Sequence, residues 1–441
     1  PARHCRMAVI ELHTQDIPAI YQRFAAVVGE RHWRQRVRLL NDEIRGNSFL
    51  EGLHRHENAV AFQLERLAEL TGRFGAAALP VYDNDELFPA ASLAAQVLSI
   101  LDASERTVGE RLKRRVHGAF KNPAEMRALR LELAAATHFL RGGRKVTWPE
   151  MDANAGAPAA GTFDPLVEDF GPTGLEVECK SVSDQRGRRI SRRQALDFYG
   201  MLRKRHWDRL LRLRTGVLAV LTVDEDLPKG HKERQGLTDF VARAVLHLGK
   251  GEYQQQGARL RIGDLDPSRL APVQGMGPVE RRELLDEVTG TKNKEVVTVG
   301  TKAGGVLVLA VQSERDDDLL DSTFAMLRDS AARQFTQGRA AMFVVGLDGI
   351  GAEQLLDVAR HDQDPGAVPT PLRLHTSRFL DSSSRSHLVG ITFLSASALR
   401  PAMGGVVDSG GAAYYFPKPD SRFWSEDFRG MYGREPKVRL A

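Results

Sequence analysis

The stretch GTFDPLVEDFGPTGLEVECK, residues 161–180, organises the rest of the chain. Its last part, LEVECK, alternates polar and apolar residues, and a period of two is typical of a β-strand. The alternation separates charged from apolar side chains on opposite strand faces: Glu176, Glu178 and Lys180 against Val177 and Cys179. Because three charged side chains on one strand face are not ordinary core, this strand predicts a functional site.

A further carboxylate stands at Asp164, in the apolar run Thr162 to Val167, which a Gly-Pro-Thr-Gly turn joins to this strand. Two carboxylates on adjacent strands repel each other unless a cation lies between them. Their hard oxygen atoms suit Mg²⁺ or Mn²⁺. Lys180 would lie beside such a metal, where an ammonium group stabilises charge on an attacking water or a phosphate. The pattern predicts a metal site for phosphate chemistry.

This arrangement resembles the PD-(D/E)xK nuclease superfamily, whose members have a restriction-endonuclease-like fold. Asp164 matches the first carboxylate of the family, and Glu178 and Lys180 match its Glu-x-Lys. The Pro-Asp of the family is here Phe163-Asp164, with Pro165 after it. The resemblance covers roughly residues 111–223, about a quarter of the chain.

Two helices extend the resemblance. Glu132, in LRLELAAATHFLRGG, matches the glutamate that the family carries on the helix before the first core strand. Gln194, on the predicted helix Ser191 to Leu213, matches a glutamine that relatives carry near the site. Glu176 is either a residue that supports the site or an exposed charge, and Cys179 is expected to be a buried apolar residue.

The resemblance implies an α/β protein with a mixed central sheet flanked by helices, and a Mg²⁺-dependent or Mn²⁺-dependent nuclease activity. Asp164 and Glu178 would hold the metal, with Glu132 and the backbone carbonyl of Cys179 as further ligands, and Lys180 would assist catalysis. DNA is the favoured substrate because most of the family cuts DNA, whereas RNA stays an alternative. Defence against foreign DNA is a role that the resemblance suggests. The rival interpretation is a nucleic-acid-binding or scaffold protein on a nuclease-like fold that does not cut.

Composition restricts the remaining choices. The 441 residues, 42% hydrophobic and 27% charged, are typical of a globular protein of two or three domains. No run of eighteen apolar residues occurs, so no membrane partner is expected. The cysteines Cys5 and Cys179 form neither a disulfide framework nor a CxxC motif, which predicts a reducing cytoplasm.

Basic residues gather in two places although the formal net charge is only +5. One cluster is RLKRR, residues 111–115, and the other follows the predicted metal site. Next to a phosphodiester-cleaving motif, such clusters predict contacts with phosphates. With Gln194, the predicted nucleic-acid-binding residues are Arg188, Arg189, Arg192 and Arg193.

Three consecutive domains are expected. Residues 1–110 show apolar residues at helical spacing and predict a helical domain for recognition or for dimerisation, so that a homodimer is one expectation. Residues 111–225 would be the nuclease core, in which a strand at 175–181, a helix and the apolar strand Gly216 to Val223 form one βαβ unit. Residues 226–441 predict a further α/β domain.

This C-terminal part contains an echo of the core. A strand at Gly305 to Ser313, a helix at Leu319 to Phe335 and a strand at Ala341 to Leu347 repeat the order strand, helix, strand. In this alignment Ala310 and Gln312 take the places of Glu178 and Lys180, which predicts a degenerate, metal-free second copy. The alternative is that this order recurs by chance in an α/β protein.

Overall fold

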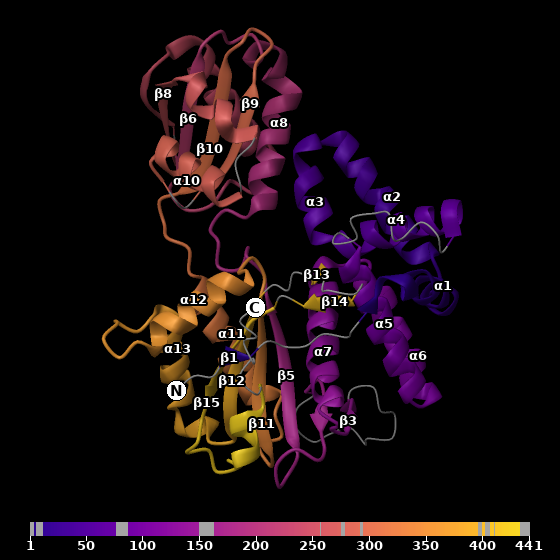
Figure 1. Ribbon diagram of the computed structural model, residues 1–441. Coiled ribbons are helices and arrows are strands. Elements are labelled where there is room, and N and C mark those ends of the chain that lie inside the picture. The colour runs from indigo at the N-terminus through magenta and orange to yellow at the C-terminus, as the bar shows by residue number, and fades with distance from the viewer. Residues whose placement is uncertain are drawn as a thin grey trace, which may run out of the picture. The chain divides into compact units, whose positions relative to one another are not determined.

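The computed structural model shows a mixed α/β protein with two main sheets flanked by helices (Figure 1). It describes residues 4–5, 12–75, 87–149, 163–255, 257–274, 278–291, 294–395, 399–401, 406–409 and 411–432. The chain divides into two compact units, each built from separated segments. Unit 1 comprises Pro1–Leu40, Glu57–Arg186 and Leu320–Ala441, and unit 2 comprises Asn41–His56 and Gly187–Leu319.

Unit 1 begins with the predicted helical part, which is confirmed. Its core includes Phe24, Trp33, Leu64 and Phe88, each at most 1% exposed, because apolar residues recur every three or four positions along these helices. The helices are α1 (Ile17–Val28), α2 (Arg31–Gly46, which continues into unit 2), α4 (Ala59–Phe74), α5 (Phe88–Ala103), α6 (Arg106–Ala119) and α7 (Pro123–Arg141).

The seven-stranded sheet of unit 1 has the order β1-β15-β12-β11-β5-β4-β3. Strands β5, β11 and β12 run parallel, and the other pairings are antiparallel. The strands are β1 (His4–Cys5), β3 (Val146–Thr147), β4 (Leu166–Val167), β5 (Leu175–Val182), β11 (Ala340–Leu347), β12 (Leu388–Ser395) and β15 (Ala413–Pro417). A three-stranded sheet joins β2 (Leu12–His13), β13 (Leu399–Pro401) and β14 (Val406–Ser409).

Different helices cover the two faces of the seven-stranded sheet. On one face, Ala135 and Phe139 of α7 pack with Cys179 of β5, and Figure 1 shows α7 alongside that strand. On the other face, Phe324 contacts Phe393 of β12. The helices on this second side are α11 (Leu319–Arg333), α12 (Ala352–Gln363) and α13 (Pro371–Leu380). The strand β5 is therefore buried on both faces.

Unit 2 contains a five-stranded sheet of order β7-β8-β6-β10-β9, in which β6 and β10 are parallel. Phe198 of α8 and Phe240 of α9 belong to the apolar cluster on one face, and Leu284 of α10 packs on the other. The elements are α3 (Glu51–Glu57), α8 (Arg192–Leu210), β6 (Gly216–Val223), α9 (His231–Arg243), β7 (Gly251–Gln255), β8 (Ala258–Leu265), α10 (Pro278–Thr289), β9 (Glu295–Gly300) and β10 (Val306–Ser313).

The expected βαβ unit from β5 through α8 to β6 is wrong. Strand β5 pairs with β11 and β4, whereas β6 pairs with β10 and β8 in the other sheet. The predicted repeat at residues 305–347 also runs from one sheet to the other, because β10 lies in the sheet of unit 2 and β11 in the sheet of unit 1. Strands β6, β10 and β11 are largely apolar, so pairing between distant segments buries them as well as pairing between neighbours would.

The expected domain boundaries consequently differ from the observed division. The segment 111–225 is split after Arg186, and the segment 226–441 is split after Leu319. The sequence also predicts a hairpin around Gly404 to Phe416; this range lies partly outside the described residues, and β15 pairs with β12 and β1 rather than with β14. The small residues of MDANAGAPAAG, residues 151–161, predict a flexible loop, which lies outside the described residues. No helix in the described ranges is long and apolar enough to cross a membrane.

Candidate functional site

Asp164 lies against the strand β5, as the sequence predicts. Its Oδ2 accepts a hydrogen bond from the backbone N–H of Cys179 at 2.8 Å, and its residue is 9% exposed. The register of β4 and β5 pairs Leu166 with Glu176. Continued by two residues beyond the start of β4, the same register sets Asp164 opposite Glu178. A carboxylate that continues the backbone ladder in this way is fixed in position by the strand rather than by a flexible loop.

Glu178 and Lys180 lie together on one face of β5. The Lys180 Nζ is 2.5 Å from Glu178 Oε1, and Glu178 is 2% exposed. Alternate residues of a strand point to one face, which explains why side chains two positions apart meet. A buried carboxylate beside a partly exposed ammonium is electrostatically stabilised, so the pair is preorganised on the strand.

The Cys179 thiol lies within the electrostatic range of all four charged residues predicted for the site. Burial is the first cause that raises the pKa of this thiol well above its usual value. Three carboxylates raise the pKa further and one ammonium lowers it, in this order of size: Asp164, Glu132, Glu178 and then Lys180. The residue is 6% exposed, which confirms the expectation that Cys179 is buried.

The carbonyl of Cys179 faces the side on which Asp164 lies. In a strand, the N–H and C=O of one residue point to the same neighbour. The Cys179 N–H points to the Asp164 carboxylate, and the N–H of Val177 likewise bonds to Pro165 O at 3.0 Å. The backbone of β5 therefore directs the Cys179 carbonyl toward the edge where Asp164 lies, as the resemblance implies for a ligand.

Glu132 approaches this region from α7. It is 5% exposed and lies one turn before Ala135 and Ala136 on that helix. Both of its carboxylate oxygens are 2.7 Å from Nη2 of Arg115, which belongs to α6. Because α7 packs on the Cys179 face, Glu132 and Glu178 approach the strand from opposite faces. Arg115 was part of a basic cluster in the sequence, but its pairing with Glu132 was not foreseen.

Glu176 has a structural partner that the sequence did not indicate. The residue is completely buried, and Thr336 donates to it from its backbone N at 3.0 Å and from its hydroxyl. Burial raises the pKa of Glu176, while the hydrogen bonds from Thr336 act in the opposite direction. Of the two interpretations offered by the sequence, the exposed charge is wrong. The partner lies 160 residues away, so no local pattern could have revealed it.

The donor set fits a divalent metal in its chemistry. Asp164 and Glu178 supply carboxylate oxygens and Cys179 a carbonyl oxygen, all hard ligands of the type that Mg²⁺ and Mn²⁺ take. Among the residues that the structure describes, no group of three or more His, Cys, Asp and Glu side chains is arranged to hold a metal ion. Glu132 and Glu178 point instead to the cations Arg115 and Lys180.

Gln194 belongs to unit 2, whereas Asp164 and Glu178 belong to unit 1. Its Oε1 accepts hydrogen bonds from the backbone N and the hydroxyl of Ser191, both at 2.8 Å. The Ser191 hydroxyl in turn accepts from the Gln194 backbone N, which completes a capping box at the start of α8. The observed role of Gln194 is thus to cap a helix.

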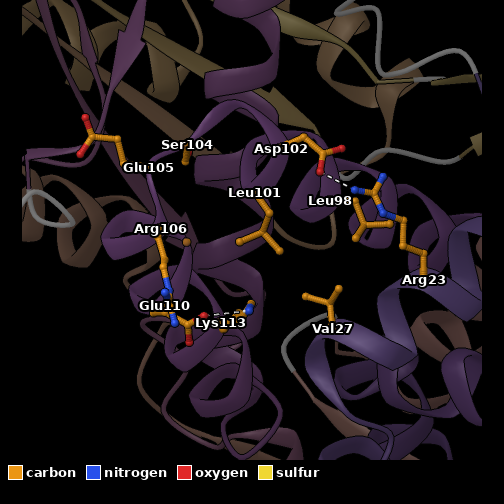
Figure 2. Close-up of a pocket in the computed structure, with 11 residues that line it drawn as sticks. Arg23, Val27, Leu98, Leu101, Asp102, Ser104, Glu105, Arg106, Glu110 and Lys113 are labelled. Atoms are coloured by element: carbon orange, nitrogen blue, oxygen red, sulfur yellow. Dashed lines mark hydrogen bonds and ion pairs between the residues drawn. The ribbon is translucent and has the colours of Figure 1, made fainter.

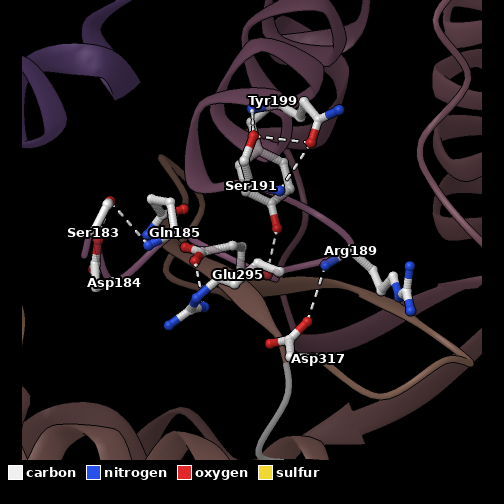
Figure 3. Close-up of polar contacts among 10 residues, drawn as sticks. Ser183, Asp184, Gln185, Arg189, Ser191, Tyr199, Glu295 and Asp317 are labelled. Atoms are coloured by element: carbon white, nitrogen blue, oxygen red, sulfur yellow. Dashed lines mark hydrogen bonds and ion pairs between the residues drawn. The ribbon is translucent and has the colours of Figure 1, made fainter. Parts of the chain in front are cut away.

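Three of the predicted nucleic-acid-binding arginines have carboxylate partners within unit 2. Arg188 lies 3.1 Å from Glu295, whose backbone carbonyl also accepts from Tyr199, and the Arg189 backbone N donates to Asp317 at 3.0 Å (Figure 3). The remaining ion pairs are Arg189–Asp318, Arg193–Asp197 and Arg193–Glu43. These carboxylates offset much of the positive charge of the run, and phosphate contacts by Arg188, Arg189, Arg192 and Arg193 stay a prediction.

Known proteins add no further information about this site. No family model matches the chain, and searches of curated proteins and of solved structures find no match. The interpretation of the site rests on its own geometry.

Proposed function

We propose that unit 1 is a divalent-metal-dependent nuclease that hydrolyses phosphodiester bonds, with DNA as the favoured substrate. The observation that carries the proposal is that Asp164 is bonded to the backbone of β5 at Cys179, the residue between the ion-paired Glu178 and Lys180. These residues come from two adjacent strands joined by a short turn, and all are largely buried. Retaining charged groups in such a position costs stability, which favours a catalytic purpose.

In this proposal the oxygens of Asp164 and Glu178 and the Cys179 carbonyl hold the metal, whereas Glu132, which the resemblance implies as a further ligand, approaches β5 from the opposite face and is paired with Arg115. When bound, a divalent cation would lower the pKa of a water molecule and offset the charge of the scissile phosphate. Lys180 would stabilise the charge that develops during attack, and its contact with Glu178 keeps the ammonium group at the site.

The fold that we propose for unit 1 is a restriction-endonuclease-like core with one exchange. The order α7, β3, β4, β5 follows the resemblance, but the next helix and parallel strand are α11 and β11 instead of α8 and β6. The predicted second copy at residues 305–347 is wrong as a strand-helix-strand unit, because β10 and β11 lie in different sheets. Ala310 is completely buried, and Gln312 donates to Thr222 at 3.0 Å.

The rival function is a nucleic-acid-binding or scaffold protein that does not cut. One observation favours it: Glu132 and Glu178 are each held by a cation of the protein itself, Arg115 and Lys180. A nuclease requires these carboxylates to exchange an internal cation for a metal, whereas a scaffold does not. We also propose a setting for the nuclease. Cysteine usage favours a reducing cytoplasm, the helical part favours a homodimer, and the resemblance suggests defence against foreign DNA.

Incubation of the whole protein with linear, circular and single-stranded DNA and with RNA tests the proposal. Each substrate is combined with Mg²⁺, Mn²⁺ or EDTA. The nuclease interpretation predicts products with either metal and none with EDTA. Binding without any products under all metal conditions supports the scaffold interpretation, and products from RNA alone would change the substrate.

A further inference from the structure

A hollow of about 580 Å³ lies between α6 and α7 of unit 1. The α6 side contributes residues at intervals of three and four, which fall on one face of a helix. The charged residues that line it are Arg111, Arg114, Arg115 and, from α7, Glu125. Arg115 is paired with Glu132, so Arg111 and Arg114 against Glu125 leave an excess of one positive charge on the lining.

A second hollow, of about 210 Å³, borders the opposite side of α6 and serves as a comparison (Figure 2). It is lined by Arg23, Arg106 and Lys113 and by Asp102, Glu105 and Glu110, so its charges balance. Two ion pairs, Arg23–Asp102 and Lys113–Glu110, join these groups. A polyanion gains no net attraction from such a surface. Of these two hollows, the one at Arg111 and Arg114 is suited to a polyanion by its charge.

The arginine-lined hollow is connected to the candidate catalytic site. Arg115 lines the hollow and holds both oxygens of Glu132 at 2.7 Å. The charge of Glu132 in turn raises the pKa of the Cys179 thiol. The Cys179 N–H donates to Asp164 at 2.8 Å. Arg115 and Glu132 therefore link the hollow to α7, the helix that packs on β5.

We propose that this hollow binds the phosphate backbone of the nucleic acid that the site cuts, an inference that rests on the proposed function. Guanidinium groups bind phosphate oxygens with paired hydrogen bonds, and Arg114 is exposed while Arg111 is half-buried at the rim. Arg115 would share its guanidinium between a phosphate and Glu132, which makes it a positioning residue between the backbone and the site. Phosphate contacts of this kind give affinity without base specificity.

The test compares two variants of the whole protein that alter charge on the same helix. Arg111→Gln with Arg114→Gln removes two charges from the arginine-lined hollow, and Lys113→Gln with Arg106→Gln removes two from the balanced one. Binding to labelled duplex and single-stranded DNA is measured in Ca²⁺ over a range of salt concentrations. Cleavage in Mg²⁺ is measured in parallel.

We expect the first variant to reduce the slope of log affinity against log salt by about 0.9 per lost contact for duplex DNA and about 0.7 for a single strand. The second variant should keep the wild-type slope. Equal slopes for both variants, or no measurable binding by the wild type, would overturn the inference. If the wild type cuts while the slopes are equal, the nuclease function stands without the hollow; if the slope depends on the hollow but nothing is cut, the hollow stands without the nuclease.

Discussion

The Asp164 carboxylate accepts a hydrogen bond from the backbone N–H of Cys179, at a distance of 2.8 Å. This bond extends the pairing of β4 with β5 beyond Leu166, so the backbone determines where the carboxylate lies. The next residue before Cys179 on the strand is Glu178. This hydrogen bond therefore holds the Asp164 carboxylate against the backbone of β5, one residue from Glu178.

Replacing Asp164 with Asn separates this structural role from catalysis. An Asn oxygen can still accept from the Cys179 N–H, so thermal stability should change by less than about 1 kcal/mol. The lost negative charge should abolish cleavage. Asp164→Ala, which loses the acceptor as well, should be inactive and about 1 kcal/mol less stable. Thermal unfolding and cleavage assays measure both effects, and an Asn variant that cuts at the wild-type rate would contradict the role.

Replacing Lys180 with Met should affect both rate and stability. The rate should fall on the order of 10²-fold or more, because one electrostatic stabiliser of the transition state is lost. Stability should fall by about 3 kcal/mol, because Glu178, 2% exposed, loses its buried cation. The double variant with Glu178→Gln should recover stability and remain inactive. Recovery of cleavage by that double variant would show that the pair serves structure alone.

His387 should make the stability of unit 1 depend on pH. Burial, followed by the charges of Arg422, Lys418 and Arg385, lowers the pKa of this histidine to about 4. Its pKa in the unfolded chain is about 6.5, so the unfolded state binds the proton more readily between these values. The stabilisation is complete above about pH 6.5 and is lost as the pH falls toward 4.

The expected loss between about pH 7 and about pH 5 is roughly 2 kcal/mol of unfolding free energy. Urea unfolding followed by tryptophan fluorescence measures it, since Trp33, Trp148 and Trp424 belong to unit 1. His387→Gln is the control, because it cannot titrate and should lose less stability over this range. The same pH dependence in both proteins would assign the effect to other groups.

Cys179 should resist alkylation in the folded protein. Its residue is 6% exposed, and burial together with the neighbouring carboxylates keeps the thiol protonated. Peptide mass spectrometry after treatment with iodoacetamide at mildly alkaline pH should show Cys179 unmodified until denaturant is added. Rapid labelling in the native state would mean that the strand β5 is accessible and would contradict the packing of α7 on it.

Local patterns in the sequence were sufficient to place Asp164 against β5 and Glu178 with Lys180 on one face of that strand. A short turn joins the Asp164 segment to β5, and a period of two brings Glu178 and Lys180 together; their joint role in a site stays a prediction. Long-range pairing was not predictable. Nothing in the apolar sequence of β5 distinguishes β11 from β6 as its parallel partner, since both are apolar strands of the same length.

The partners of the charged residues were likewise not predictable from the sequence. A glutamate on a helix stripe and a basic cluster on the preceding helix were both visible in the sequence, but their pairing as Glu132 and Arg115 depends on how α6 and α7 pack. Gln194 was assigned to the site from its place after the Glu-x-Lys, whereas the capping box that employs it is also a local signal, Ser191 followed three residues later by Gln.

The most direct measurement of the central claim is the metal dependence of DNA cleavage by the wild type and by Glu178→Gln. The account predicts that the wild type produces cleaved DNA with Mg²⁺ or Mn²⁺ and none with EDTA. It predicts that Glu178→Gln, folded by circular dichroism, produces none under any condition. Cleavage by Glu178→Gln at the wild-type rate, or by the wild type in EDTA, would contradict the account.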